Sequence, residues 1–423
     1  MIQRHLSKIV LESLQDFPVV LLIGARQVGK STLAKELTKQ NWPARYLTLD
    51  NRAVLDAALT NPDGMVQGLD LPVVLDEVQR APDLLRSVKM AVDQDRQPGM
   101  FLLTGSANVL TMSSVSETLA GRVAVHQLHP FSWTEVEGKE PSEILDHLFK
   151  AKDAKGLVRN LSLSSAPVRT KELQNFILRG GYPDPCLMKN PSSRSTWFES
   201  YRQTYLERDV RDLTSIAHVP DFNRLLVTLA LRTGQMLNFS SLSRDVGLSV
   251  STLRRYFNIL EETFQVFRIA PYHANVGKRI VKTPKAYLSD TGMACHLSDA
   301  DEWPTLQKRN QAGAMLETWV AGELRKLISI SSTRTGLYYW RTRDGREVDF
   351  LLERGGRVVG VEVKQAARID THDLAGITAC RDALKNSWYM GIVLYGGTEV
   401  VPLDQQTLAI PFSIFFGRED KII

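Results

Sequence analysis

The chain has 423 residues, of which 43% are hydrophobic and 23% are charged, and its formal net charge is +5. A prior of roughly 150 residues per domain predicts two or three domains. The longest early apolar stretch, residues 17–23, is much shorter than the roughly 18 residues that cross a bilayer, and residues 1–8 carry no signal-peptide pattern. These properties argue against a membrane protein, and we expect a cytoplasmic location.

The cysteines are few, far apart and odd in number, which excludes both a disulfide framework and the usual metal-binding spacings. They are Cys186, Cys295 and Cys380. We interpret them as small, partly buried hydrophobic residues in a reducing compartment. Basic residues exceed acidic ones over residues 201–300. This excess points to a polyanionic partner, although a solvated surface explains it equally well.

Residues 1–150 alternate apolar strands with segments of helix length, and this pattern predicts an α/β domain. The predicted strands are residues 19–23, 45–49, 73–75, 100–103 and 123–128. A helix is expected from Lys30 to about Lys39. Because the strands are almost entirely apolar, we expect a parallel sheet with helices on both faces.

A glycine-rich segment joins the first predicted strand to the first predicted helix. It reads Gly24-Ala25-Arg26-Gln27-Val28-Gly29-Lys30-Ser31-Thr32. The two glycines allow backbone amides to turn inward around phosphate oxygens, and Lys30 can reach the β- and γ-phosphates. The Ser31 hydroxyl can bind Mg²⁺. The segment therefore predicts a nucleotide-binding P-loop with ATP and Mg²⁺ as cofactors.

Two acidic residues, Asp76 and Glu77, end the predicted strand at residues 73–75. In P-loop enzymes an acid at this position holds Mg²⁺. We assign Asp76 to the metal and Glu77 to the general base that activates water. The alternative is that both acids merely cap a strand.

A polar segment, residues 104–108, ends the next predicted strand. Thr104, Ser106 and Asn108 are candidates for sensing the γ-phosphate or orienting the water, and the sequence does not choose between them. An arginine is also expected to stabilise the transition state, in cis or across a subunit interface. The candidates are Arg122, Arg26 and Arg80.

These motifs together resemble the AAA-type ATPase core of a large prokaryotic family. The matching segments include Leu-Thr-Gly-Ser-Ala-Asn at 103–108 and Leu-His-Pro-Phe-Ser-Trp-Thr-Glu at 128–135. Arg-Gly-Gly-Tyr-Pro at 179–183 and Tyr-Leu-Glu-Arg-Asp-Val at 205–210 match the family's middle region. The resemblance covers essentially the whole chain. It implies ATP hydrolysis and assembly into a homo-oligomer, with a hexamer as the expected ring.

Residues 151–300 are expected to form a linker at 151–170 followed by a helical region with a winged helix. Residues 239–256 have helix-turn-helix spacing, with Gly247 at the turn and Ser249 or Ser251 capping the second helix. The side chains expected to face inward are Leu242, Val246, Leu253, Tyr256 and Leu260.

Basic residues on this region are expected to contact DNA phosphates. Those predicted to point outward are Arg254 and Arg255 on the second helix, and Lys278, Arg279, Lys282 and Lys285 on a hairpin wing. The alternative is a structural winged helix that packs against another part of the protein.

Residues 301–423 carry four spaced residues on a helix and two strands. Glu317 lies on the helix, Asp349 on the first strand, and Glu362 and Lys364 on one face of the second. This order resembles the PD-(D/E)xK nuclease fold, especially its Holliday-junction-resolvase-like branch. The resemblance implies that Glu317, Asp349 and Glu362 bind Mg²⁺ and that Lys364 positions the attacking water. The alternative is an edge hairpin with exposed charges.

The sequence thus predicts an ATPase core at 1–150, a winged-helix region at 151–300 and a restriction-endonuclease-like domain at 301–423. Our first hypothesis is an ATP-driven motor or remodeller of DNA, with branched or junction DNA in repair or recombination suggested by resemblance alone. The second is a nucleotide-gated signalling or defence switch. The third is an ATP-regulated DNA nuclease.

Overall fold

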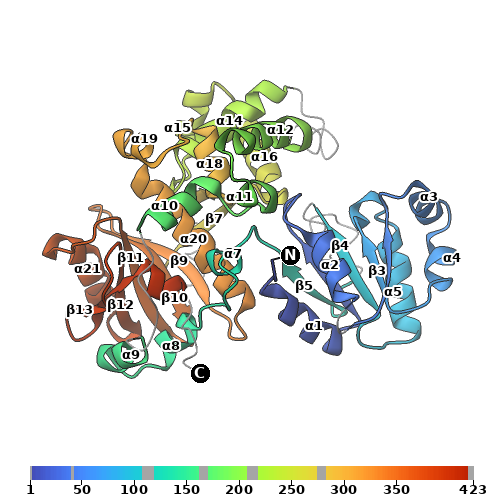
Figure 1. Ribbon diagram of the computed structural model, residues 1–423, viewed down its shortest axis with the longest axis horizontal. Helices are drawn as coiled ribbons and strands as arrows, with labels where there is room; N and C mark the ends of the chain where they lie inside the picture. The colour runs from blue at the N-terminus through green and yellow to red at the C-terminus, as the bar shows by residue number, and fades with distance from the viewer. Residues whose placement is uncertain are drawn as a thin grey trace. The chain divides into compact units, whose positions relative to one another are not determined.

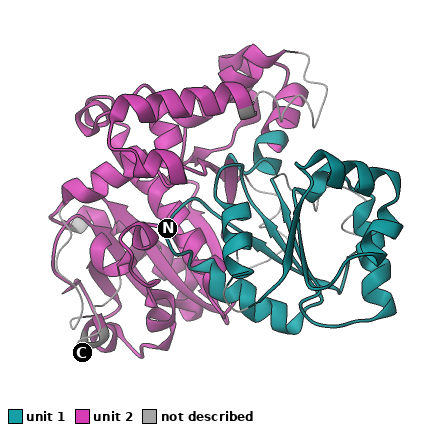
Figure 2. Cartoon of the chain, turned by 45° about the vertical axis from the view of Figure 1, so that its right-hand side comes forward, with its two compact units in different colours: residues 1–131, 259–265 teal, residues 132–258, 266–423 magenta. Residues whose placement is uncertain are grey.

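The chain folds into two compact units. The structure, a computed structural model, describes residues 2–39, 42–106, 119–161, 170–206, 218–273 and 283–417. The first unit comprises residues 1–131 with 259–265, and the second comprises residues 132–258 with 266–423 (Figure 2).

The first unit is built on a parallel sheet of five strands in the order β2-β3-β4-β1-β5 (Figure 1). The strands are β1 (Val19–Ile23), β2 (Arg45–Thr48), β3 (Val73–Asp76), β4 (Phe101–Gly105) and β5 (Val123–Gln127). Every residue of β1, β3 and β4 is buried. A strand buried along its whole length has both faces covered, which confirms the predicted α/β architecture.

In the first unit, α1 precedes β1, and helices lie between the strands from β1 to β4 along the chain. The helices are α1 (Leu6–Asp16), α2 (Lys30–Leu37), α3 (Arg52–Thr60), α4 (Pro62–Gln67), the 3₁₀ helix η1 (Val78–Arg80) and α5 (Leu84–Gln94). Apolar side chains of α5 pack with those of β3 and β4 in a single hydrophobic core. Two of these are Val88 and Val92, and both are fully buried. The core holds the carboxyl ends of the strands in fixed register.

The second unit begins with helices. They are α7 (Trp133–Val136), α8 (Ile144–Lys150), α9 (Ala154–Leu161), α10 (Thr170–Arg179), α11 (Pro183–Leu187), α12 (Pro191–Tyr201), the π-helix η3 (Arg202–Leu206), α14 (Val219–Leu231), α15 (Phe239–Val246) and α16 (Val250–Glu262). Residues 259–262 of α16 group with the first unit. Later helices are α18 (Thr291–Leu297), α19 (Trp303–Lys308), α20 (Ala312–Ile330), η4 (Thr371–Leu374), α21 (Ala375–Leu384), η5 (Lys385–Ser387) and α22 (Phe412–Phe416).

One mixed sheet of nine strands runs through the second unit, in the order β13-β14-β12-β11-β10-β9-β7-β8-β6. Its strands are β6 (Gln235–Met236), β7 (Val266–Pro271), β8 (Lys285–Leu288), β9 (Gly336–Arg341), β10 (Glu347–Arg354), β11 (Arg357–Lys364), β12 (Trp388–Tyr395), β13 (Val401–Pro402) and β14 (Thr407–Pro411). Strands β7 and β9 pair in parallel, with Ala270 opposite Tyr338. Because of this pairing, strands from both sides of residue 300 belong to one sheet. The domain boundary that we expected at residue 300 therefore falls inside the second compact unit.

Two helices and a hairpin form the part of this unit where a winged helix was expected. The turn between α15 and α16 contains Gly247 in the left-handed region, at φ 75°. Leu242, Val246, Leu253 and Tyr256 are buried, as the spacing predicts. The Ser249 hydroxyl accepts the amide of Thr252 at 3.2 Å. Strands β7 and β8 then pair as an antiparallel hairpin.

Candidate functional site

The glycine-rich loop lies between β1 and α2, as its sequence predicts. Gly24 has φ 150° and Gly29 has φ 95°, both in the region that favours glycine. A Cβ on Gly24 would lie 2.3 Å from the carbonyl oxygen of Leu128. A side chain at this position would therefore force the loop away from the adjacent segment.

Two basic side chains donate hydrogen bonds to backbone carbonyl oxygens of this loop. The buried ammonium of Lys30 donates to the carbonyl oxygens of Gly24 and Ala25 at 3.0 and 2.9 Å. The buried Arg4 donates to the carbonyl oxygen of Val28 at 2.7 Å. Sequence reasoning missed Arg4, because nothing in the local pattern links it to a loop more than twenty residues away. Of the remaining positions expected to contact nucleotide, Arg26 and Gln27 lie in the turn between β1 and α2, and Thr32 lies in the first turn of α2.

Asp76 is the centre of a hydrogen-bond network at the carboxyl end of β3. Its buried carboxylate accepts from Ser31 at 3.0 and 3.1 Å and from Tyr46 at 2.6 Å, and the Thr104 hydroxyl also donates to it. Burial, followed by the hydrogen bond to Asp76, raises the pKa of Tyr46 well above its usual range. The structure thus brings together the hydroxyl and carboxylate that were predicted to hold Mg²⁺. Hard oxygen ligands of this kind suit that ion.

Glu77 follows β3 with a left-handed backbone, at φ 64°. Its amide donates to the Thr104 hydroxyl at 3.2 Å. The side-chain amide of Gln79 donates to the Glu77 carboxylate and, at 2.9 Å, to the Ser106 hydroxyl. Gln79 therefore joins the proposed base to one of the predicted polar residues. Asn108 lies outside the described residues.

Tyr46 and Gln79 were also missed by sequence reasoning. Tyr46 lies on β2, which pairs with β3. Its contact with Asp76 depends on strand order, which no local pattern supplies. Gln79 could have been noticed, because it lies two residues after the predicted base.

Arg122 lies at the amino ends of the strands, whereas the P-loop lies at their carboxyl ends. Strand β5 runs parallel to β1, with Val19 opposite Val123, so Arg122 precedes the amino end of β1. Its guanidinium pairs with Asp93 at 2.6 Å. Five residues of strand cover about 16 Å, so Arg122 does not reach the phosphates of its own chain. This corrects the expectation that Arg122 could act in cis. Arg80 pairs with Asp50 at 2.6 Å.

A second cluster of charges lies in the second unit, on strands β10 and β11. The Asp349 carboxylate accepts the amide of Val363 at 2.8 Å, and Lys364 lies 3.2 Å from Glu362 and 3.4 Å from Asp373. Burial, and then the charge of Glu362, raises the pKa of Asp349. Burial also raises the pKa of Glu362 to about 7. One oxygen of Glu362, Oε2, is buried without a hydrogen-bond partner.

Glu317 belongs to a neighbouring part of this cluster. Its Oε1 accepts from Lys285 at 2.9 Å and from Tyr287 at 2.7 Å. Lys285 also pairs with Glu347. Lys285 is only 3% exposed, which contradicts its predicted place on an exposed wing. Among the described residues, no three His, Cys, Asp or Glu side chains are arranged to hold a metal ion.

Of the other residues expected to contact DNA, two are described. Arg254 and Arg255 are exposed, with Arg254 stacked on Phe239 at 4.6 Å and Arg255 on Tyr256 at 5.5 Å. Lys278, Arg279 and Lys282 lie outside the described residues.

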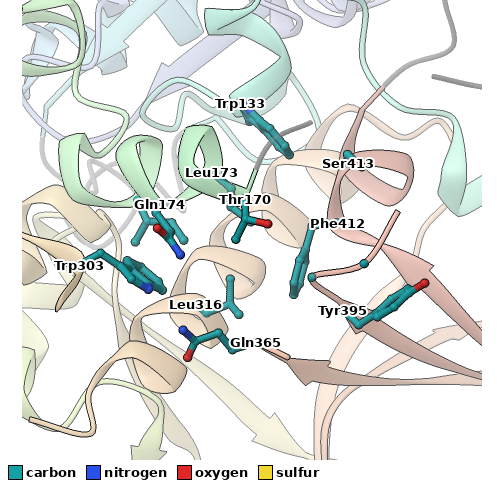
Figure 3. A pocket seen from close by; sticks show the side chains of 13 residues that line it. Trp133, Thr170, Leu173, Gln174, Trp303, Leu316, Gln365, Tyr395, Phe412 and Ser413 are labelled. Carbon is teal, nitrogen blue, oxygen red and sulfur yellow. The ribbon is translucent and has the colours of Figure 1, made fainter. Parts of the chain in front are cut away.

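An apolar pocket lies elsewhere in the second unit. Aromatic side chains line much of it, and Trp133, Trp303 and Phe412 are visible in Figure 3. None of the residues predicted to bind nucleotide, metal or DNA lines this pocket. No helix in the described ranges is long and apolar enough to cross a membrane.

Three family models match the chain in succession. Residues 16–137 match an AAA domain, residues 170–303 match a domain of unknown function (DUF8612), and residues 312–415 match another (DUF4143). The first match, with the geometry above, shows a P-loop AAA-type ATPase fold in the first unit.

Relatives match the chain over most of its length. An uncharacterized protein of Mycobacterium tuberculosis is 30% identical over 94% of this chain and 81% of its own. An uncharacterized protein of Haemophilus influenzae is 21% identical over 71% of this chain and 67% of its own. Among solved structures, the Walker-type ATPase of Pyrococcus abyssi is 17% identical, covers 70% of this chain and 96% of its own, and has a TM-score of 0.44.

Proposed function

Because the chain belongs to the same family as this mycobacterial protein, with an AAA domain at its N-terminus, we propose that it is a Mg²⁺-dependent ATPase coupled to DNA. The coupled activity is movement or remodelling of DNA, with branched or junction DNA as the substrate class. The observation that carries the DNA assignment is the order of elements in residues 219–288, where a helix-turn-helix is followed by an antiparallel hairpin. That order, with Arg254 and Arg255 exposed on the second helix, suits phosphate contacts.

The proposed hydrolysis uses residues at the carboxyl edge of the first sheet. Ser31 and Asp76 would hold Mg²⁺, which supplies charge neutralisation at the phosphates. Lys30 leaves the carbonyl oxygens of its own loop to pair with phosphate oxygens. Glu77 accepts a proton from the attacking water, once the amide of Gln79 releases its carboxylate.

DNA should accelerate the ATPase if the two activities are coupled. The rate is measured without DNA and then with linear duplex, single strand and four-way junction, using Glu77→Gln to correct for contaminating hydrolysis. We expect a several-fold increase with DNA, largest with the junction. An equal rate with all four would instead support a nucleotide-gated signalling or defence switch.

Tyr46→Phe is expected to weaken the use of Mg²⁺ without preventing folding. The change removes the hydroxyl that donates to Asp76 at 2.6 Å and leaves the ring in place. A hydrogen bond to a charged group contributes about 1.5 to 3 kcal/mol, so the Mg²⁺ concentration for half-maximal activity should rise about tenfold. Tyr395→Phe is a matched control, because its hydroxyl donates to the backbone oxygen of Glu399 in the second unit. Equal Mg²⁺ dependence in both variants would exclude a positioning role for Tyr46.

A second candidate function is DNA cleavage by the cluster on β10 and β11. The order α20, β9, β10, β11, α21, β12 supports a PD-(D/E)xK-like fold, with Lys364 beside Glu362. If the site cleaves DNA, Asp349→Ala should abolish Mg²⁺-dependent cleavage measured on labelled duplex and junction. Asp344→Ala is the control, since Asp344 is exposed in the turn before the same strand. Cleavage that survives Asp349→Ala would contradict this assignment.

We further propose that the chain assembles into a homo-oligomeric ring, with a hexamer as the expected size. The AAA domain supports this, because such sites are often completed by an arginine from a neighbouring subunit. Arg122 remains a candidate for that role only if it acts on the ATP site of a neighbouring subunit. Sedimentation with and without ATP measures the assembly.

A further inference from the structure

The carboxylates of the second unit already have a cation beside them. Lys285 is more than thirty residues from Glu317 in the sequence, yet its ammonium lies 2.9 Å from the Glu317 carboxylate. It also pairs with Glu347. A lysine that is 3% exposed needs such partners, because an isolated buried charge is costly.

Strand β8 presents two donors to the same carboxylate oxygen. Tyr287, two residues after Lys285, donates to Glu317 Oε1 at 2.7 Å. Alternate residues of a strand share one face, so this pairing follows from the geometry of β8. The Tyr339 hydroxyl donates to the backbone oxygen of Thr283 at 2.5 Å and ties the start of this strand to β9. Glu317 is therefore held by β8 and is not free to bind a metal ion.

The three predicted metal ligands fit a divalent cation only in part. Antiparallel pairing places Phe350 opposite Val361, so Asp349 and Glu362 are neighbours across β10 and β11, and Glu362 Oε2 is buried without a hydrogen-bond partner. These two carboxylates could accept a cation. Glu317 cannot join them while it accepts from Lys285 and Tyr287. The charge of Lys285 also acts on Asp349. A divalent ion there would be repelled by the neighbouring ammonium.

We propose that Lys285 is a built-in counter-ion that competes with divalent metal for the carboxylate cluster. While Lys285 occupies its place, Glu317 is neutralised and the cluster binds Mg²⁺ or Mn²⁺ weakly. Strand β8 belongs to the antiparallel hairpin that follows the helix-turn-helix, so one strand connects that hairpin to the cluster. The inference rests on the proposed nuclease-like site only for the identity of the metal ligands.

Metal binding to the full-length chain tests this inference without DNA or nucleotide. Mn²⁺ is titrated by calorimetry into the unaltered protein and into Lys285→Gln, which removes the charge but keeps an amide donor. We expect Lys285→Gln to bind Mn²⁺ about tenfold more tightly. The double variant Lys285→Gln/Glu317→Gln should lose that gain, because the freed carboxylate is absent.

Arg341→Gln is the matched control. Arg341 also pairs with Glu347, at 2.9 Å, but its side chain is 41% exposed. Its loss should leave Mn²⁺ affinity unchanged. Equal affinity in Lys285→Gln and the unaltered protein would overturn the proposal, as would an equal gain in Arg341→Gln.

The stability of the variant gives a second readout. If Lys285→Gln is destabilised by the uncompensated carboxylates, Mn²⁺ should raise its thermal midpoint more than that of the unaltered protein. A variant that Mn²⁺ does not stabilise would also contradict the proposal. Because no DNA or ATP is present, these outcomes are independent of DNA-stimulated ATP hydrolysis.

Discussion

Glu77→Gln is expected to reduce ATP hydrolysis by about 10² to 10⁴-fold while nucleotide binding is retained. A positioned general base contributes rate enhancement of this order, and glutamine has nearly the same shape but cannot accept the proton. The P-loop and Asp76 are untouched by the change, so affinity for ATP should stay within a few-fold. Single-turnover hydrolysis and equilibrium binding of a fluorescent nucleotide measure the two quantities separately.

Asp70→Asn provides the control for Glu77→Gln. It makes a comparable change of charge on an exposed residue that precedes β3, whereas Glu77 follows that strand. The two residues therefore lie at opposite ends of β3, and only Glu77 lies beside the P-loop edge. Unchanged hydrolysis in Glu77→Gln would assign the base elsewhere. Loss of binding together with hydrolysis would indicate a structural role for Glu77.

The nucleotide site was largely predictable because its main residues are tied to strand ends. In a parallel sheet the carboxyl ends lie at one edge, so the glycine loop after β1, Asp76 at the end of β3 and Thr104 in β4 had to approach one another. Tyr46 could not be predicted in the same way. Its contact with Asp76 requires that β2 lie beside β3, and nothing within residues 45–49 specifies that order.

Arg122 and Lys285 show why isolated charges were harder to place. Arg122 follows a glycine in a motif typical of this family, but its distance from the P-loop depends on the register of β5 with β1. Lys285 ends a basic segment that resembles an exposed wing. Its strand lies between β7 and β6, and the opposing carboxylate comes from α20. Both errors arise from long-range pairing, which local charge patterns do not encode.

Arg254→Glu/Arg255→Glu is expected to abolish most DNA binding and the stimulation of ATP hydrolysis by DNA. Both guanidinium groups are exposed on α16 and are stacked on aromatic rings, which limits the freedom they would lose on binding phosphate. Replacing two cations with two anions should weaken binding by at least about tenfold at low salt. The dependence of log affinity on log salt should become shallower by about 2, since each phosphate contact contributes about 0.9.

The control for this double variant is Lys152→Glu/Lys155→Glu, which makes the same change of charge at two exposed positions near α9. If net charge alone governs binding, both double variants will lose affinity and salt dependence equally. If α16 contacts the phosphates, only the arginine variant will lose affinity and show the shallower salt dependence, while its ATPase rate without DNA stays unchanged. The ATPase rate without DNA shows whether the variant has lost only its contact with DNA or has a damaged ATPase site. A protein that keeps full affinity after Arg254→Glu/Arg255→Glu binds DNA through another surface, or does not use this helix for DNA at all.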